Sequence, residues 1–335
     1  MISRYVFVTI PQDPLIDANS GLFKDLLLQD KYNIIFNPVY KYYNSSIKNF
    51  IMRIIFANKL NFIFFAIKKY FYKFDKIWFN KNEKIYFIIP SMCAIKIDIK
   101  YLKKLKKENP NLNFILLILD SLGAHSLHLK YLNIEILNNN FWDCIMSFDR
   151  TDCEKHGFKY LGLFYYSSFN EIKPSMNKTD IYYIGFLKGK REELIGKIYD
   201  KCIVNNLSAN INIIYKKILK INNSNLKTST IRKSYPNIIA EIKSTNCILE
   251  VLQKGQESQS IRYFEAVVYN KKLLSNNPNL KKLPFYDERY MKYFEKVDDI
   301  DWKWVAKRED IDYKYNNEFS PIHMLEQIEK YFERK

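Results

Sequence analysis

Residues 246–277 read NCILEVLQKGQESQSIRYFEAVVYNKKLLSNN, and their pattern decides the fold. The apolar run 246–251 predicts a buried strand, and the polar residues that follow it predict a turn. Residues 260–270 then predict a helix, and 272–275 predict a second strand. Strands that alternate with helices in this way favour a parallel sheet covered by helices.

The turn and the helix of this stretch carry groups that suit a phosphorylated ligand. The polar and flexible residues of the turn are Gln253, Gly255, Gln256, Ser258 and Ser260. In the helix, Arg262 and Glu265 lie one turn apart, so their side chains share a face. A helix N-terminus beside an arginine can hold a phosphate, and a glutamate on the same face can accept hydrogen bonds from sugar hydroxyls. The stretch therefore predicts a nucleotide diphosphate-sugar site, with an exposed helix ion pair as the alternative.

The same alternation continues on both sides of this stretch. Before residue 167 it predicts strands at 4–10, 33–37, 85–89, 113–119, 142–148 and 160–165, and helices at 99–108 and 122–131. After residue 179 it predicts strands at 180–186 and 211–215 and helices at 190–205 and 236–244. The polar stretch 167–179 contains Pro174 and marks a domain boundary.

Two successive parallel α/β units are therefore expected, followed by one last helix. Ser320 can cap that helix, Pro321 suits its first position, and an apolar stripe follows at Ile322, Leu325 and Ile328. In such folds ligands bind at the carboxyl ends of the strands, so a cleft between the units is the expected site.

The net charge of +17 is concentrated in one part of the chain. Residues 41–108 contain sixteen Lys or Arg against four Asp or Glu, a balance of +12. Within them, 41–76 mixes aromatic and basic residues. This segment is either an interfacial membrane helix that contacts anionic lipid, or one or two core helices with a solvated lysine face. No nucleic-acid-binding motif accompanies it, so nucleic acid is not an expected partner.

The cysteines and the apolar runs bear on the compartment. The five cysteines form no CxxC pair and the four histidines are scattered, so neither a disulfide framework nor a zinc site is expected. The longest uncharged stretch, 202–215, is too short and too polar to span a bilayer. Residues 1–10 predict a first strand and no signal peptide. The expectation is a cytoplasmic protein, and peripheral association with the cytoplasmic face of the inner membrane stays open.

Three segments carry a resemblance to a known family. The first is SFDRTDCEKHG at 147–157, followed by YLGLFY at 160–165 and preceded by Leu119-Asp120-Ser121. The others are the block at 250–277 and IGFLKGKR at 184–191. Together they resemble bacterial GT-B-type glycosyltransferases of lipopolysaccharide and capsular polysaccharide biosynthesis. The similarity spans roughly 110–290. Ser258 departs from the family, which has glycine there, and Gly162 stands where the family has proline.

This resemblance implies a GT-B-like fold, in which two Rossmann-like parallel-sheet domains face each other across a cleft. Residues 1–170 would bind the acceptor, 171–318 would bind the nucleotide-sugar, and the helix in 319–335 would cross back to the first domain. The implied donor-binding residues are Gly185, Lys188, Arg191, Gln253, Gln256, Ser258, Ser260, Arg262 and Glu265. Among them Lys188, Arg191 and Arg262 would clamp the diphosphate.

The resemblance also implies roles for the acidic residues. Glu265 would bind the ribose or the transferred sugar, and its spacing from Glu257 resembles the paired glutamates of retaining enzymes. No DxD-like pair stands in a convincing turn, so we expect no metal and no cofactor besides the nucleotide-sugar substrate. Asp120, His125 and Asp13 follow predicted strand ends and are the candidate bases on the acceptor side. Asp149 and Asp152 are expected to cap the turn after 142–148.

These features predict a metal-independent, hexosyltransferase-like enzyme. It would move a sugar to a glycan or lipid-linked glycan acceptor in lipopolysaccharide, lipooligosaccharide or capsule assembly. Two alternatives stay open. One is a glycerol-phosphate-type transferase of the same architecture. The other is a basic module that binds membrane or nucleic acid without catalysis.

Overall fold

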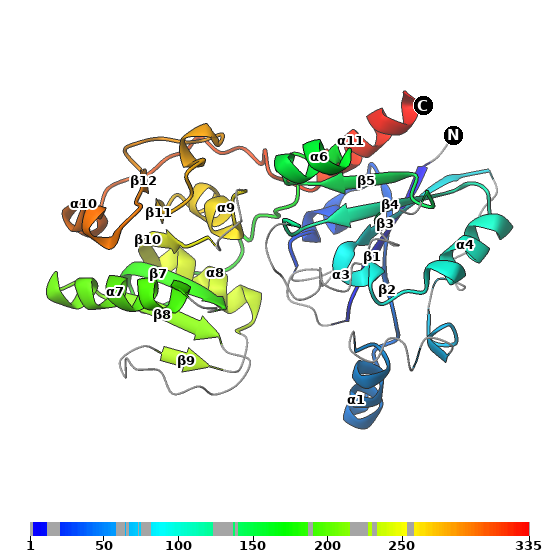
Figure 1. The fold of residues 1–335 in the computed structure, drawn as a ribbon, viewed down its shortest axis with the longest axis horizontal. Helices are drawn as coiled ribbons and strands as arrows, with labels where there is room; N and C mark the ends of the chain where they lie inside the picture. Colours follow the sequence, from blue (N-terminus) through cyan, green and yellow to red (C-terminus); the bar gives the residue numbers. More distant parts are fainter. Residues whose placement is uncertain are drawn as a thin grey trace. The chain divides into compact units, whose positions relative to one another are not determined.

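The computed structural model divides the chain into two compact units. It describes residues 3–11, 21–57, 64, 67–72, 74, 82–122, 137, 140–186, 190–214, 227–229, 233–252 and 258–334. Unit 1 comprises Met1–Ser167 together with Phe319–Lys335, and unit 2 comprises Ser168–Glu318. Each unit is built around its own parallel sheet, as Figure 1 shows.

The sheet of unit 1 has six parallel strands in the order β2-β1-β3-β4-β5-β6. The strands are β1 (Ser3–Thr9), β2 (Asn33–Pro38), β3 (Lys84–Pro90), β4 (Leu112–Ile118), β5 (Cys144–Ser147) and β6 (Lys159–Tyr160). Strands β1, β3 and β4 are nearly continuous apolar runs whose residues are almost all buried. This is the pattern of strands covered on both faces.

The described part of unit 1 includes five α-helices and one 3-10 helix. They are η1 (Lys24–Leu28), α1 (Ser46–Ile55), α3 (Ser91–Ala94), α4 (Ile99–Glu108), α6 (Arg150–His156) and α11 (Ile322–Glu333). The last helix, α11, belongs to unit 1 although unit 2 precedes it in sequence. The rings of Phe332 and Tyr86 lie 5.0 Å apart, which joins the helix to β3. The predicted return of the C-terminal helix to the first domain is confirmed.

The start of α11 differs from the prediction. The helix begins at Ile322, and Pro321 occupies the N-cap position without a side-chain cap. Ser320 is buried, and its hydroxyl lies 3.2 Å from Asp25 Oδ2, so it links the helix to η1. The buried residues of the helix include Leu325 and Ile328, as predicted, but Met324 takes the place expected for Ile322.

The sheet of unit 2 also has six parallel strands, in the order β12-β11-β10-β7-β8-β9. The strands are β7 (Thr179–Phe186), β8 (Ala209–Ile214), β9 (Lys227–Ser229), β10 (Thr245–Glu250), β11 (Lys272–Ser275) and β12 (Met291–Tyr293). The helices are α7 (Lys190–Val204), α8 (Tyr235–Ser244), α9 (Ile261–Val268) and α10 (Trp302–Ala306), with 3-10 turns at Leu280–Lys282 and Val297–Asp299. Strands β7 and β10 are neighbours from which the chain proceeds in opposite directions. This is the switch point at which doubly wound sheets bind ligands.

Most predicted elements lie where expected, and the largest error is at 160–165. Helix α4 and strand β11 have the predicted bounds, and the other described strands and helices differ by a few residues. Beyond Lys159–Tyr160 the chain leaves the sheet, because Gly162 adopts a left-handed φ of 78° that ends the strand. Strands β9 and β12 and helix α10 were not predicted, and the helix predicted at 122–131 lies largely outside the described residues.

The cysteines belong to the cores of the two units. All five are free and buried. Burial raises the pKa of the Cys202 thiol, and likewise that of Cys247, to about 12. These are protonated core thiols, which fits the prediction of reduced cysteines. Among the residues that the structure describes, no helix is long and apolar enough to cross a membrane.

Candidate functional site

The carboxyl end of β10 is fixed by its last residue, Glu250. The Glu250 side chain is buried, and its Oε1 accepts a hydrogen bond of 2.8 Å from the Ser260 backbone N–H. Its Oε2 accepts one of 2.5 Å from the Ser275 hydroxyl. Burial raises the pKa of Glu250, and these donors oppose the rise. One carboxylate therefore ties the end of β10 to the start of α9 and to the end of β11.

Helix α9 begins at this point. Ser260 is its N-cap, and the hydroxyl accepts a hydrogen bond of 3.2 Å from the Arg262 backbone N–H. Tyr263, Phe264, Ala266 and Val267 are buried and hold the helix against the sheet. The first turn of α9 therefore lies at the carboxyl edge of the sheet, beside the switch point between β7 and β10.

Arg262 and Glu265 form an ion pair inside the protein. The Glu265 side chain is fully buried and that of Arg262 is 12% exposed, with Arg262 Nη1 on Glu265 Oε2. The other carboxylate oxygen accepts a hydrogen bond of 3.0 Å from the Tyr235 hydroxyl. Burial raises the pKa of Glu265 to about 7, although Arg262 and Tyr235 both oppose the rise. The alternative of an exposed helix ion pair is therefore wrong.

Arg191 and Arg262 both lie close enough to the buried Tyr183 to affect its hydroxyl. Burial raises the pKa of the Tyr183 hydroxyl, and the positive charges of Arg191 and Arg262 both oppose this rise. Tyr183 belongs to β7, and Arg191 lies in the first turn of α7, which follows it. Two arginines that are far apart in the sequence thus both lie near the end of β7.

Gly185 makes room for the same tyrosine. A Cβ atom at position 185 would lie 2.6 Å from the Tyr183 hydroxyl oxygen and 3.0 Å from Cζ. Real Cβ contacts are not that short, so a larger residue would make the Tyr183 ring shift. The glycine of the IGFLKGKR segment therefore leaves room for this ring at the end of β7.

A second polar cluster, made of Tyr182 on β7, Glu241 on α8 and Lys233, lies near the ion pair. The Tyr182 hydroxyl donates a hydrogen bond of 3.0 Å to Glu241 Oε2, and Lys233 Nζ lies 2.5 Å from Glu241 Oε1. Burial raises the pKa of Tyr182, Arg262 opposes the rise, and Glu241 and Glu265 add to it. Sequence reasoning missed Tyr182, Tyr235 and Glu241, because nothing in their spacing shows that α8 lies beside α9.

Several buried polar atoms near this site have no hydrogen-bond partner in the described part of the chain. Among them are Ser258 Oγ, Gln259 Nε2 and Asn277 Nδ2. An unsatisfied buried polar atom costs about 1–3 kcal/mol, so these atoms are candidates for contacts to a ligand. Ser258 was predicted as a donor-site residue, whereas Gln259 was not. Asn277 matched the family pattern but was given no role.

Five of the predicted site residues lie outside the described residues. They are Lys188, Gln253, Gln256, His125 and Asp13.

Asp120 is described and follows β4 in unit 1, half-buried. Nearby, Asp149 caps α6, and Asp152 accepts a hydrogen bond of 2.7 Å from the Leu122 N–H. Asp149 therefore caps this turn as predicted, whereas the Asp152 side chain ties α6 to Leu122, after β4.

Comparison with known proteins identifies a solved structure with a similar fold. No protein-family model matches the chain, and no curated protein matches it. Among solved structures, HepE of Anabaena in complex with UDP and glucose is 11% identical, with a TM-score of 0.50 over 99% of each chain. The chain has the GT-B fold.

Two further structures are similar at lower scores. The apo form of the lipopolysaccharide outer core galactosyltransferase WaaB is 12% identical, with a TM-score of 0.41 over 99% of this chain and 100% of that one. A glycosyltransferase from Rickettsia africae is 9% identical, with a TM-score of 0.45 over 99% and 98%. The similarity to HepE concerns the GT-B fold alone.

Proposed function

We propose that this GT-B protein is a metal-independent glycosyltransferase. It moves a sugar from a nucleotide diphosphate-sugar to a growing lipopolysaccharide, lipooligosaccharide or capsule glycan. The observation that carries the proposal is the meeting of Arg191, Gly185 and the buried Arg262–Glu265 pair beside the switch point of unit 2. Unit 2 would then bind the donor and unit 1 the acceptor.

The arginines suit the leaving group of such a reaction. When the bond between the anomeric carbon and the phosphate oxygen breaks, negative charge grows on the diphosphate and the sugar becomes oxocarbenium-like. Preorganised positive donors stabilise that charge without a metal. A guanidinium has five N–H donors, so Arg262 can contact both Glu265 and a phosphate. Each charge-assisted hydrogen bond contributes about 1.5–3 kcal/mol. Lys188, which lies between β7 and α7 in the sequence, would complete the clamp.

Glu265 has two tasks in this proposal. Its carboxylate orients the Arg262 guanidinium, and the Tyr235 hydroxyl orients the carboxylate in turn. It would also accept a hydrogen bond from a ribose or sugar hydroxyl. The acceptor hydroxyl would lose its proton to a base on unit 1, for which Asp120, His125 and Asp13 stay the candidates.

A nucleotide thermal-shift assay tests the proposal. UDP is the first nucleotide to test, since the structure of HepE contains UDP and glucose. At about 100 times its dissociation constant, a ligand stabilises the folded protein by roughly 2.7 kcal/mol. For a unit of this size that corresponds to about 5–10 °C in Tm. A panel of nucleotide diphosphates that leaves Tm unchanged would refute donor binding and favour a binding module.

A transfer assay with a panel of nucleotide-sugars would then separate glycosyl transfer from glycerol-phosphate transfer. Both reactions would use the diphosphate clamp, so the thermal shift alone does not distinguish them. Transfer of glycerol phosphate without transfer of any sugar would replace the proposed activity by the alternative one.

A further inference from the structure

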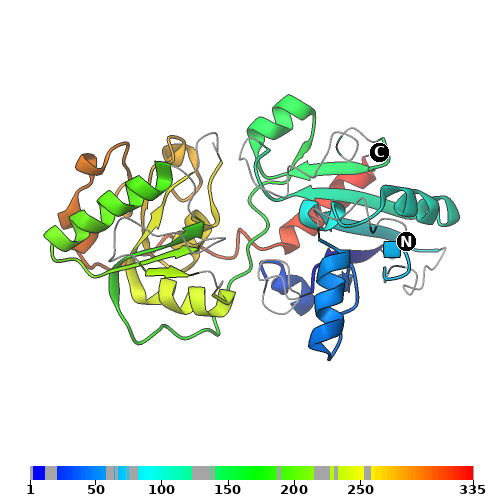
Figure 2. The ribbon, with the colours of Figure 1, turned by 60° about the horizontal axis from the view of Figure 1, so that its bottom comes forward.

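Helix α1 exposes an apolar stripe to solvent. Ile47, Phe50, Ile51 and Ile54 are 74%, 63%, 48% and 36% exposed. Their spacing of three and four residues places them on one face of the helix. Asn49, Met52 and Ile55 are buried on the other side, so the stripe faces away from the core of unit 1. Figure 1 and Figure 2 show α1 at the periphery of that unit.

The helix that carries the stripe is firmly attached to unit 1. At its start, the buried Asn49 side chain accepts a hydrogen bond of 2.8 Å from the Tyr43 N–H and donates one of 2.5 Å to the Tyr43 carbonyl. At its end, Lys96 Nζ donates a hydrogen bond of 2.9 Å to the Phe56 carbonyl. The Phe56 ring stacks on Tyr40 with centroids 4.5 Å apart. The stripe is therefore a fixed surface rather than a loosely packed segment.

A basic groove adjoins the end of α1. The Tyr72 ring lies 6.0 Å from Phe56 and 4.8 Å from Tyr101, so residues 67–72 connect α1 to α4. Between residues 67–72 and α4, a groove of about 670 Å³ is lined by Lys69, Tyr70, Asp98, Lys100, Tyr101, Lys104, Leu105, Glu108 and Asn109. Its three lysines are exposed, and Tyr70 is exposed beside them. Lys104 Nζ lies 3.7 Å from Glu108 Oε1, in an exposed ion pair that leaves it accessible to solvent. Apolar and positively charged surfaces therefore follow one another across three elements.

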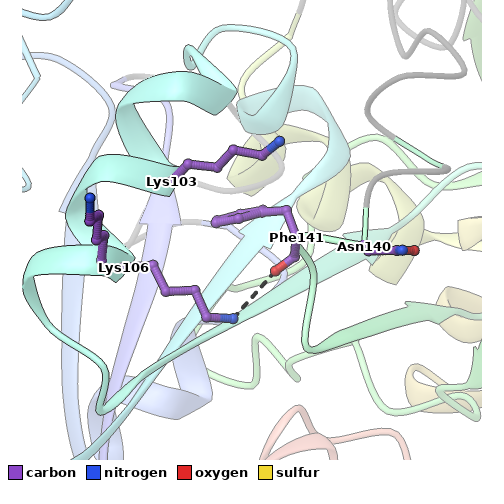
Figure 3. A pocket seen from close by; sticks show the side chains of 5 residues that line it. Lys103, Lys106, Asn140 and Phe141 are labelled. Atoms are coloured by element: carbon purple, nitrogen blue, oxygen red, sulfur yellow. Dashed lines mark hydrogen bonds between the residues drawn. The ribbon is translucent and has the colours of Figure 1, made fainter.

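The far side of α4 extends the positive charge. Figure 3 shows Lys103 and Lys106 around Phe141 in a smaller pocket that Lys107 and Asn140 also line. Lys106 is paired with Asp143 and donates to the Phe141 carbonyl at 3.4 Å, so its role there is structural. Lys103 and Lys107 are exposed and add to the field around the groove.

We propose that the α1 stripe and the lysines of the adjoining groove form a docking surface for a bilayer that contains anionic lipid. An amphipathic helix can bury its apolar face at the boundary between headgroups and acyl chains, while basic residues bind anionic headgroups. Each such residue raises the partition onto an anionic surface roughly fivefold. This inference does not depend on the proposed activity.

A second copy of the chain is a poorer occupant of this surface. Helix α1 is only about 15 Å long, and its four apolar side chains expose roughly a few hundred Å², against about 800 Å² per partner in a stable interface. A twofold dimer through α1 would also bring the +12 segment against itself. A bilayer with negative headgroups complements both features at once.

Vesicle co-flotation of the full chain tests this surface. We expect the wild type to float with vesicles of equal parts phosphatidylcholine and phosphatidylglycerol, and to float much less with phosphatidylcholine alone. The F50S/I51S variant should lower partition onto the mixed vesicles at least about tenfold, since two buried apolar side chains are lost. Replacing Lys69, Lys100 and Lys104 by Gln should lower it about a hundredfold, because three basic contacts are lost.

Matched controls lie on unit 2. Ile203 and Val204 are exposed apolar residues at the end of α7, and I203S/V204S should float as the wild type does. A triple Lys→Gln change at exposed Lys281, Lys282 and Lys303 controls for net charge. All replaced residues are exposed, so circular dichroism melting should be unchanged.

Three outcomes would overturn the proposal. In the first, the wild type fails to float with the mixed vesicles. In the second, F50S/I51S floats as well as the wild type. In the third, a unit 2 control variant loses as much partition onto the vesicles as the unit 1 variant to which it is matched. Analytical ultracentrifugation that shows a dimer dissolved by F50S/I51S, without flotation of the wild type, would assign the stripe to a second copy instead.

Discussion

The buried carboxylate of Glu265 should make the protein less stable at neutral pH than a neutral side chain would. Burial raises its pKa in the folded protein to about 7, from an ordinary value of 4.5. The native state therefore binds more protons than the unfolded state between these two values, so stability falls as pH rises through this window. This rise in the pKa of Glu265 corresponds to about 3 kcal/mol of lost stability at pH 7 and above.

The Glu265→Gln variant measures the stability that is lost when the buried Glu265 carboxyl group ionises. Glutamine resembles the protonated glutamate, because its amide oxygen can still accept a hydrogen bond from Arg262 and its amide NH2 can donate one to the Tyr235 hydroxyl oxygen. At pH 4.5 and below, the variant and the wild type should unfold with nearly equal free energies. At pH 8, the variant should be more stable by up to about 3 kcal/mol. Urea unfolding, followed by tryptophan fluorescence from Trp302 and Trp304 in unit 2, measures the difference at each pH.

The exposed Glu193 on α7 provides a control, because its ion pair with Lys197 lies at the surface. Glu193→Gln should change the free energy of unfolding by less than about 1 kcal/mol. If Glu265→Gln destabilises the protein at pH 8, or shifts stability equally at all pH values, the reasoning from burial is wrong. The proposed function adds a second expectation, namely that the stabilised variant binds and transfers the donor sugar more poorly.

Three further substitutions address the clamp, the strand end and the base. Arg262→Ala should lower the rate of sugar transfer at least about tenfold while the protein stays folded. Arg289→Ala is the control, because Arg289 pairs with Asp287 at the surface, and it should leave the rate unchanged. An unchanged rate in Arg262→Ala would refute the diphosphate clamp. Gly185→Ala should destabilise unit 2 by about 1–3 kcal/mol, because the new Cβ meets the Tyr183 hydroxyl. In a double-mutant cycle, Tyr183→Phe should relieve part of this loss of stability. Strictly additive effects of the two substitutions would contradict the contact between positions 183 and 185. Asp120→Asn should slow transfer about a hundredfold and leave the nucleotide thermal shift unchanged; wild-type rates exclude Asp120 as the base.

The alternation of apolar runs and helical segments was enough to predict the fold. Period and length separate buried strands from helices, so most strands and helices lie within a few residues of their predicted bounds. The errors occur where a single backbone conformation decides, as at Gly162, or where strands are very short, as in β9 and β12. Sequence order also left the strand order open. The neighbours β7 and β10, which define the switch point, are separated by about sixty residues in the chain.

The candidate site was predictable only where its residues follow one another in the chain. Arg262 and Glu265 share a helical face at a spacing that is visible in the sequence. The hydroxyl that holds Glu265 comes from Tyr235 on another helix, thirty residues earlier. Packing of Gly185 against Tyr183 likewise depends on side-chain directions at a strand end, which no spacing rule supplies.

The two buried glutamates of unit 2, Glu250 and Glu265, belong to one sequence motif but have different roles that only their contacts reveal. Glu250 is held by neutral donors from two fixed elements, the Ser260 N–H and the Ser275 hydroxyl, so it stabilises the junction of β10, α9 and β11. Glu265 is held by one tyrosine and by a charged arginine that retains N–H donors for another anion. Both glutamates match the same family pattern, yet only Glu265 is paired with a group suited to bind phosphate. Removal of Glu250 should therefore weaken folding, whereas removal of Glu265 should weaken ligand binding while stabilising the protein at neutral pH.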